Sequence, residues 1–188
     1  MNIYLLAGYA GSGKSCAGAI LQSMLPNSAC LAFATQIKDD VAHVYNIPRH
    51  LFDTQEGKQS TVTVSHGTFT LRELLIEYSQ HGKDVTNDNA IWAKGVVDDI
   101  RKTPTVMNWI IHDWRYTYEY TTLREAFPQA NIYRIRIHRP SVIPQHIPSE
   151  QSLENYPVDQ TVWNTRDIKE LTFELRRIID VNHIQTLL

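Results

Sequence analysis

Residues 8–15 of the chain read GYAGSGKS, and they follow the apolar run NIYLLA at positions 2–7. This octapeptide matches G-x-x-x-x-G-K-[ST], the phosphate-binding P-loop pattern, whose meaning depends on a preceding strand and a following helix. The apolar run is typical of a strand that is buried on both faces of a parallel sheet. Residues 15–24 carry apolar side chains at helical spacing, and Pro26 lies beyond them. The sequence therefore predicts a strand, a P-loop and a helix in succession.

The residue types of this loop suit a bound polyphosphate. Glycines allow backbone N–H groups to converge on phosphate oxygens, and the new helix adds the positive end of its dipole there. We expect Lys14 to bridge the β- and γ-phosphates and Ser15 to offer its hydroxyl to Mg²⁺. The alternative, a merely tight glycine turn, leaves the lysine unexplained. The residues expected to contact the phosphates are Gly8, Gly11, Ser12, Gly13, Lys14, Ser15 and Cys16.

The composition bounds the class of protein. With 188 residues, 43% of them hydrophobic and 20% charged, the chain fits one globular domain with a sizeable core. The 18 basic and 20 acidic residues leave a formal charge of −2, so no global field attracts nucleic acid or an acidic membrane. Anionic ligands must therefore be held by local groups.

The cysteines and the apolar runs bear on the compartment. Cys16 and Cys30 are too few for a disulfide framework, which favours a reducing environment. Residues 3–7 lack a basic flank, and the apolar runs of the sequence fall short of the ~18 residues that span a membrane. We therefore expect a cytoplasmic protein without a membrane partner.

Strands alternate with helices along the chain. Apolar runs predict strands at 2–7, 29–34, 105–111, 131–137 and 161–163. Helical spacing predicts helices at 15–24, 35–46, 71–81, 88–102, 117–127 and 167–179. This alternation predicts an α/β fold with a parallel sheet, helices on both faces and right-handed crossovers.

Residues 49–69 are less regular. The segment TVTVSHGTFT at positions 61–70 suggests a small β-hairpin. Thr70 and Glu73 form a T-x-x-E capping box for the helix that follows, and Gly82 is expected to end that helix.

A proline-rich excursion follows the fourth strand. Four prolines lie within residues 140–157, so we expect a segment that moves as a lid over about 138–160. Phosphoryl transfer requires positive charge at the transferring group and exclusion of water. Arg139 stands at the mouth of the excursion, where closure would bring its guanidinium onto the phosphates. The alternative is a solvated arginine that merely follows a strand.

Charged residues after the third strand suit a metal and a phosphate. Asp113 follows the apolar run 109–112, which is where a P-loop fold places an acid near the metal; the alternative is a cap of the next helix. Arg115 has a planar fork suited to phosphate oxygens, and its alternative is a surface ion pair with Glu119. We predict Ser15 and Asp113 as metal ligands. The predicted catalytic residues are Lys14, Asp113, Arg115 and Arg139.

A further group of residues is predicted to bind the phosphoryl acceptor, together with Arg115. Lys38 and Asp39 follow the second strand. Arg72 lies in the first turn of a helix, where a cation opposes the dipole and calls for an anionic partner. That partner is either a substrate phosphate or one of the neighbouring acids, Glu73 and Glu77. Trp92 is either a base-stacking platform or a core residue.

The histidines show no metal-ligand spacing and no Cys or Ser partner. His112 and His138 are expected to be packing or polar-edge residues, and the role of His146 stays open.

Together these residues resemble the phage-type deoxynucleoside monophosphate kinases, within the P-loop nucleoside monophosphate kinase group. The resemblance rests on the order and spacing of several short motifs along most of the chain. It comprises residues 8–15, IKD at 37–39, LRELL at 71–75 with Gly82, Asp113-Trp114-Arg115 with Glu119, Arg139-Pro140, His146 with Ser149-Glu150, and Trp163-Asn164.

The resemblance implies a three-layer P-loop kinase fold, with a five-stranded sheet in the order 2-3-1-4-5 and a small lid. It implies one domain over residues 1–188, with an acceptor-binding insertion at about 35–103. It also implies ATP as the phosphoryl donor, Mg²⁺ as the cofactor and a deoxynucleoside monophosphate as the acceptor. A homodimer stays open, and a virus-encoded protein would work in the host cytoplasm.

The resemblance also assigns roles to single residues. Arg139 would belong to the lid, Lys38 and Arg72 to the acceptor side, and Asn164 to the surroundings of the donor adenine. Lys83 is a candidate substitute for an arginine that the family pattern leads us to expect after Gly82.

Two other functions remain open. One is a P-loop kinase of a non-nucleotide small molecule, and the other is a nucleotide-binding module without a second substrate. The sequence holds no NKxD-type guanine signature, which disfavours a GTPase. The proline-rich lid with Arg139 favours a kinase, because a switch has no acceptor phosphate to enclose.

Overall fold

The structure is a computed structural model that describes residues 1–144 and 148–185. The chain forms two compact units. The first comprises Met1–Ala32 and Val96–Leu188, and the second comprises Phe33–Gly95. The description of the whole chain as one kinase domain with an acceptor-binding insertion stays a prediction.

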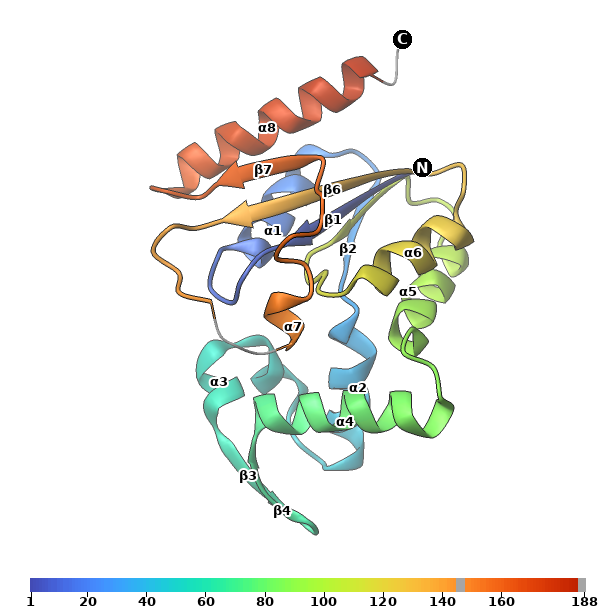
Figure 1. The fold of residues 1–188 in the computed structure, drawn as a ribbon, viewed down its shortest axis with the longest axis vertical. Coiled ribbons are helices and arrows are strands. Elements are labelled where there is room, and N and C mark those ends of the chain that lie inside the picture. Colours follow the sequence, from blue (N-terminus) through green and yellow to red (C-terminus); the bar gives the residue numbers. More distant parts are fainter. Residues whose placement is uncertain (145–147, 186–188) are drawn as a thin grey trace. The chain divides into compact units, whose positions relative to one another are not determined.

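The first unit is built on a five-stranded parallel sheet (Figure 1). Its strands are β1 (Asn2–Ala7), β2 (Ser28–Leu31), β5 (Asn108–Ile111), β6 (Asn131–His138) and β7 (Gln160–Trp163). They lie in the order β2-β5-β1-β6-β7. Because β3 and β4 belong to a separate hairpin, this is the order 2-3-1-4-5 when the strands of the sheet are counted along the chain. The predicted α/β fold is confirmed.

A row of asparagines fixes where three of these strands begin. Asn2 pairs in register with Asn108 on one side and with Asn131 on the other. Its side chain donates to Asn108 Oδ1 at 2.9 Å and accepts from Asn131 Nδ2 at 3.0 Å. Since the three strands are parallel and start in register, their carboxyl ends and the loops that follow lie at the same edge of the sheet. That edge is where ligands bind in open α/β sheets.

The helices cover both faces of the sheet because of the order of the strands. The chain moves from β1 to β2 in one direction along the sheet and from β5 to β6 in the other. Right-handed crossovers therefore place α1 (Lys14–Met24) and α6 (Thr117–Ala126) on opposite faces. The terminal helix α8 (Ile168–Gln185) shares one apolar cluster with α1, in which Leu21, Leu171 and Leu175 pack on Tyr4 and Leu6.

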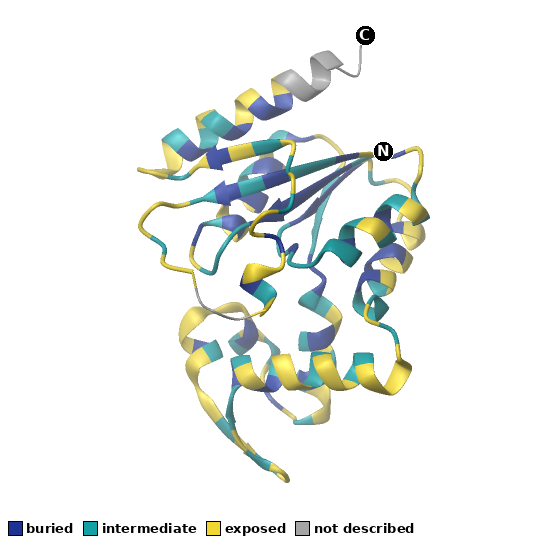
Figure 2. Ribbon diagram, in the orientation of Figure 1, coloured by how far each residue is buried: buried dark blue, intermediate teal, exposed yellow. Residues whose placement is uncertain are grey.

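Burial follows the same plan. The side chains of β1 from Ile3 to Ala7 are at most 1% exposed, and those of β5 are all buried. Figure 2 shows these strands in dark blue, with exposed residues on the outer turns of the helices. A central strand without a polar alternation is the pattern that the apolar run predicted.

The second unit has its own small core. Its elements are α2 (Ala34–Val44), the 3₁₀ helix η1 (Arg49–Asp53), α3 (Gln55–Gln59), β3 (Thr61–Val64), β4 (Gly67–Thr70) and α4 (Leu71–Thr86). Helix α5 (Ile91–Lys102) continues from it into the first unit. The core consists of Ile37, Val41, Ile47, Phe52, Leu71 and Leu74. Val62, Val64 and Phe69 of the hairpin pack on it, while Thr61, Thr63 and Thr68 are exposed.

Two predictions about this region need correction. Residues 49–59, expected to be irregular, hold η1 and α3. Helix α4 does not stop at Gly82 but continues to Thr86 and ends at Asn87, which takes a left-handed conformation. A side chain at Gly82 would lie 2.6 Å from the Trp92 ring. Glycine stands there because an indole packs against the helix, not because the helix ends.

Candidate active site

The P-loop leaves β1 through glycines that take unusual backbone conformations. Gly8, Gly11 and Gly13 have φ values of 144°, 83° and 102°. These values disfavour any residue with a Cβ. A side chain at Gly8 would in addition clash with the carbonyl oxygen of Ile137 on β6. The glycine spacing of the motif is therefore required by the geometry of the loop.

Lys14 lies inside this loop and is 8% exposed. Its ammonium donates to Gly8 O at 2.5 Å and to Tyr9 O at 2.7 Å. The side chain thus curls back over the start of the loop, where the charge is held within reach of an anion bound to the loop.

The hydroxyl of Ser12 is compatible with a phosphate bound to the loop. Its Oγ is buried and has no hydrogen-bond partner among the described residues. A buried hydroxyl without a partner is costly, and a phosphate oxygen would satisfy it. The loop therefore carries a donor that a bound phosphate would use, in addition to its backbone N–H groups.

Two side chains from later in the chain hold the P-loop from outside. Glu150 Oε1 accepts a hydrogen bond from Ala10 N at 2.8 Å, and Asn164 Nδ2 donates to Ser12 O at 2.9 Å. Asn164 was expected beside the donor adenine. The structure places it on the P-loop backbone, and its contact with adenine stays a prediction. The sequence carries no spacing rule that joins Glu150 to residue 10.

The loop after β5 brings Asp113, Trp114 and Arg115 to the same edge of the sheet as the P-loop. Trp114 is 1% exposed, and its backbone N–H donates to Leu6 O at 3.2 Å. Helix α6 begins at Thr117 after Tyr116, so Asp113 does not cap it. The capping alternative for Asp113 is wrong, and its role as a metal ligand stays a prediction.

Glu119 shapes this loop. Its Oε2 accepts from Arg115 N at 2.7 Å and from Tyr116 N at 2.9 Å. Burial raises the pKa of this carboxyl to about 8, against the opposing effect of the backbone donors. The alternative of a surface ion pair with Arg115 is therefore wrong, because the carboxylate is buried and engaged with backbone. Arg115 is half-buried, and within residues 1–144 and 148–185 its guanidinium forms no ion pair, although its charge acts on Glu119.

A cavity of about 110 Å³ lies beside the P-loop in this unit. The residues that line it include Gly8, Trp114, Arg115, Arg136 and Glu150. The start of the P-loop and Arg115 therefore line the same cavity.

The proline-rich segment is better packed than the sequence indicates. It contains the short helix α7 (Pro148–Gln151), and Arg136 of β6 donates to the carbonyl oxygens of Leu153, Glu154 and Tyr156. Arg139 is exposed, and its guanidinium has no partner in the described parts of the chain. His146 lies outside the described residues. A lid movement stays a prediction.

In the second unit, Lys38 and Asp39 belong to a network of charges. Lys38 pairs with Asp53 at 2.9 Å, and Arg49 pairs with Asp53 at 2.8 Å and with Asp39. Burial alone would raise the pKa of Asp53, but the hydrogen bonds from Lys38 and Arg49 outweigh it and lower that pKa. Sequence reasoning missed Arg49, although its i,i+4 spacing to Asp53 is a readable signal.

Arg72 is left without an acidic partner in this unit. Glu73 accepts from the backbone N–H and the hydroxyl of Thr70, which completes the predicted capping box. Glu77 pairs with His66 at 3.1 Å. The alternative of an ion pair with either glutamate is wrong, and the half-buried Arg72 guanidinium has no partner among the described residues.

Trp92 has a packing role. Its indole N–H donates to Ser79 O at 3.1 Å, and its ring lies 6.3 Å from that of Tyr78. Together with its contact at Gly82, this supports the core alternative over a base-stacking platform.

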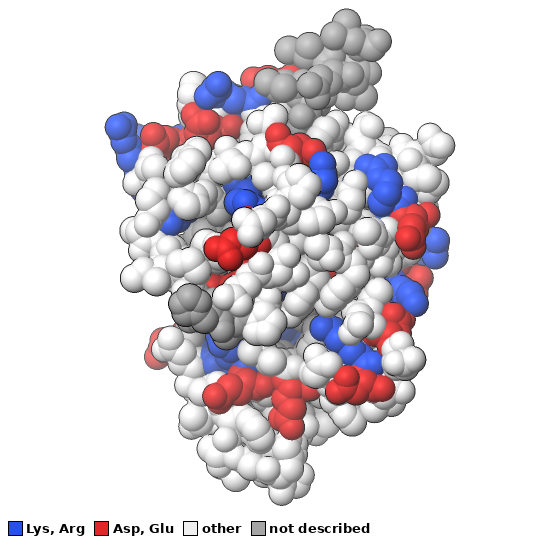
Figure 3. Space-filling model, in the orientation of Figure 1, with Lys and Arg blue, Asp and Glu red and all other residues white. Residues whose placement is uncertain are grey.

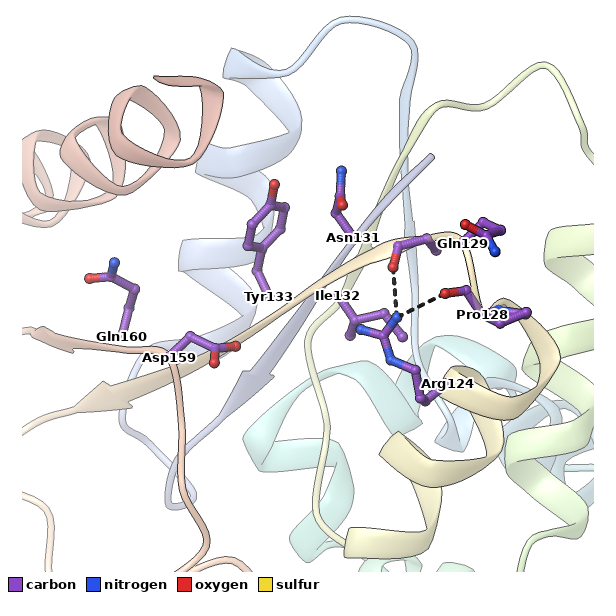
Figure 4. A pocket seen from close by; sticks show the side chains of 9 residues that line it. Arg124, Pro128, Gln129, Asn131, Ile132, Tyr133, Asp159 and Gln160 are labelled. Atoms are coloured by element: carbon purple, nitrogen blue, oxygen red, sulfur yellow. Dashed lines mark hydrogen bonds between the residues drawn. The ribbon is translucent and has the colours of Figure 1, made fainter. Parts of the chain in front are cut away.

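A second pocket lies far from this chemistry. It measures about 650 Å³ and is lined by residues at the start of β6 and β7, the sheet edge opposite the P-loop (Figure 4). Arg124 donates there to Ala130 O at 2.8 Å, and Asp159 pairs with Arg134. Its charges are engaged with the protein, so we place the active site at the P-loop. On the face shown in Figure 3, basic and acidic side chains are both present among larger uncharged areas.

Mg²⁺ fits the residues available. Among the described residues, no three His, Cys, Asp or Glu side chains form a metal cluster. Mg²⁺ in a nucleotide site takes only one or two protein oxygens and fills the rest of its shell with phosphate and water. The exposed hydroxyl of Ser15 and the carboxylate of Asp113 meet that need.

Each helix within the described residues is too short or too polar to cross a bilayer. No protein-family model and no curated protein matches the sequence. Solved structures do match. A sugar kinase from a Janibacter species matches at 12% identity and a TM-score of 0.50, covering 96% of this chain and 95% of its own.

Two further kinases match with lower TM-scores. The APS kinase of Mycobacterium tuberculosis, solved with AMPPNP and APS, is 11% identical with a TM-score of 0.49, over 95% of this chain and 97% of its own. A gluconokinase from Sinorhizobium meliloti is 14% identical with a TM-score of 0.47, over 98% and 97%. With its parallel sheet, its P-loop and its likeness to the sugar kinase, the chain has the fold of the P-loop kinases.

Proposed function

We propose that the protein transfers the γ-phosphoryl group of ATP to a deoxynucleoside monophosphate, which gives ADP and the diphosphate. The observation that carries the proposal is the pair of half-buried guanidiniums without acidic partners, Arg115 beside the P-loop and Arg72 in the second unit. A guanidinium that forms no ion pair within the protein keeps its planar set of donors available, so each of them suits a phosphate that a substrate would bring. The choice of a deoxynucleotide rests on the family resemblance of the sequence.

The donor triphosphate would bind the P-loop. Its oxygens would accept from the backbone N–H groups of the loop and from the buried Ser12 hydroxyl. Lys14 would exchange its carbonyl contacts for the β- and γ-phosphates. Ser15 and Asp113 would hold Mg²⁺, which supplies positive charge against the charge on the β- and γ-oxygens.

The transfer itself needs positioning and charge more than covalent chemistry. An oxygen of the acceptor monophosphate attacks the γ-phosphorus, and the bond to the β,γ-bridging oxygen breaks, leaving ADP. Arg72 would hold the acceptor phosphate through its planar fork. Arg115 and Arg139 would stabilise the charge on the transferring group.

A kinase of a non-nucleotide small molecule is the second candidate. One observation favours it: the Trp92 indole packs between helices, which supports its core role over that of a base-stacking platform. The likeness to a sugar kinase shows the fold alone and does not separate the two candidates.

A coupled ADP-release assay separates these functions. ATP and Mg²⁺ would be present throughout, and the acceptors would be the common deoxynucleoside and nucleoside monophosphates, small sugars and sugar acids. We expect turnover with at least one deoxynucleoside monophosphate and background rates with sugars. Turnover with a sugar alone would establish the second candidate. ATP binding without turnover on any acceptor would point to a non-catalytic module.

A further inference from the structure

Glu150 is an acidic residue beside the P-loop, where a negative charge is unfavourable for binding phosphate. Its side chain is 6% exposed, and its Oε1 accepts the Ala10 N–H of the P-loop at 2.8 Å. A carboxylate beside a bound triphosphate repels it. Its position therefore needs a reason, and the hydrogen bond to the loop supplies one.

The segment that carries Glu150 is fixed to the strands that carry the P-loop. Arg136 donates to Leu153 O at 2.5 Å, to Tyr156 O at 3.0 Å and to Glu154 O at 3.1 Å. Arg136 lies in β6 in register with Ala7, the last residue of β1 before the loop. Residues 148–156 and the P-loop thus share one rigid support.

The P-loop needs such support because its conformation is unusual. Three of its residues have positive φ, and a flexible glycine-rich loop loses much entropy when it is held in one shape. Glu150 takes up an N–H of the loop, while Asn164 donates to the carbonyl oxygen of Ser12. The two side chains therefore hold opposite kinds of backbone group at two points of the loop.

We propose that Glu150 is a positioning residue that holds the P-loop in its nucleotide-binding shape, and that residues 148–156 are a fixed support of the loop. The proposal rests on the proposed function as far as ATP binding is concerned. A carboxylate suits the role because hydrogen bonds to a charged acceptor are stronger than those to a neutral one.

The test compares Glu150→Ala with Glu150→Gln by titrating each protein with MgATP in a calorimeter. Glutamine can accept the same N–H without the charge, whereas alanine cannot. We expect Glu150→Ala to raise the dissociation constant about tenfold, because the binding-competent loop is then less populated. Glu150→Gln should stay within about threefold of the wild type. Glu154→Ala is the matched control, since Glu154 is exposed and lies 3.4 Å from the Tyr9 hydroxyl.

A second measurement reads the hydrogen bond itself. Amide exchange of the nucleotide-free protein should show Ala10 protected in the wild type and in Glu150→Gln, and unprotected in Glu150→Ala. The KM for the acceptor should not change in any of these variants, which separates a local effect on the P-loop from a general loss of structure.

The outcomes that would overturn the proposal are distinct from failure of the proposed function. If Glu150→Ala binds MgATP as tightly as the wild type, Glu150 does not position the loop. If Glu150→Ala does not fold, an exposed Ala10 amide in the wild type still refutes the proposal, and a protected one supports it. If the wild type fails to bind MgATP, the proposed function fails, and the exchange of Ala10 alone decides the role of Glu150.

Discussion

The acidic side chains beside the predicted site residues are engaged differently in the two units of the chain. In the first unit, Glu119 and Glu150 accept hydrogen bonds from backbone N–H groups of functional loops. In the second unit, Asp39 and Asp53 pair with basic side chains instead. The difference decides which cations remain for a substrate. Among the described residues of the first unit, Arg115 forms no ion pair, because the oxygen of the nearby Glu119 accepts from backbone N–H groups.

In the second unit, the partners of the carboxylates leave one of the predicted acceptor-binding cations without an ion pair. Lys38 and Arg49 are neutralised within their network, whereas Arg72 is left because Glu73 caps its own helix and Glu77 pairs with His66. The partner of each carboxylate therefore separates structural cations from those available to phosphate. Three substitutions of cations test this separation, and a pH series then compares Glu119 with Asp53.

Lys14→Ala should have the largest effect. The ammonium donates to backbone carbonyl oxygens of the loop and is positioned for phosphate, so its loss should lower turnover by ~10²–10⁴ without unfolding the protein. ADP release and the melting temperature would be measured on the same preparation. Lys102→Ala, which removes an exposed lysine paired with Asp99, should change neither. Near-normal activity of Lys14→Ala would refute the P-loop assignment.

Arg139→Ala should lower kcat by roughly 10- to 100-fold while the KM for ATP stays unchanged, because an exposed arginine that reaches the phosphates only during transfer contributes to the transition state. Steady-state kinetics with varied ATP give both constants. Arg166→Ala, an exposed arginine 3.9 Å from Glu170, is the control. A strong change in ATP affinity with an unchanged kcat would show that Arg139 contacts the donor in the ground state.

Arg72→Lys tests the cation without an acidic partner in the second unit. Lysine keeps the charge but loses the planar fork, so kcat/KM for the acceptor should fall about tenfold while the KM for ATP and the melting temperature hardly move. Arg101→Lys, at an exposed arginine near Asp98, should leave all three unchanged. If the melting temperature falls and the acceptor kinetics do not, then Arg72 is a structural residue.

The opposite surroundings of Glu119 and Asp53 predict opposite responses to pH. Burial raises the pKa of Glu119 from 4.5 to about 8, so the folded protein holds more protons than the unfolded chain between those values. Its contribution to stability is complete below pH 4.5 and is lost as the pH rises toward 8. The pKa of Asp53 is lowered from 3.8, so its contribution is lost only as the pH falls below that value.

Urea unfolding at pH 5, 6.5 and 8 compares the two carboxyls. Between pH 5 and pH 8 the wild type should lose of order 1 kcal/mol more stability than Glu119→Gln. Asp53→Asn should lose stability over that range as the wild type does. If the free energy of unfolding changes equally with pH in the wild type and in Glu119→Gln, then Glu119 does not titrate in this range.

The features predicted correctly depend on short-range patterns. The P-loop, the hairpin at 61–70 and the capping box of Thr70 and Glu73 each involve residues within a few positions of one another. The α/β alternation is equally local, and the resemblance then supplied the order of the strands. The turn and helix chemistry of such segments is readable because neighbouring residues decide it.

The features that the sequence did not predict depend on residues far apart in the chain. Glu150 binds a backbone group 140 positions earlier, and Asn164 binds one 152 positions earlier. At Gly82 the local rule predicts the end of a helix, but packing of Trp92 overrides it. The role of an arginine depends on whether the nearby acids already bind other groups, and only the folded structure shows the partners of those acids.

The position of β1 has a consequence for the order in which the protein is made. Asn2 is hydrogen-bonded to Asn108, 106 residues later, and β6 on the other side comes later still. At a synthesis rate of ~5–20 residues per second, the first strand waits roughly 5 to 20 seconds for its first neighbour. Residues 33–95 are one continuous stretch with contacts of their own, so all the residues of the second unit are available during that time. The strand that leads into the P-loop is thus translated before both of its neighbours, so this part of the nucleotide site is completed only after β6 has been made.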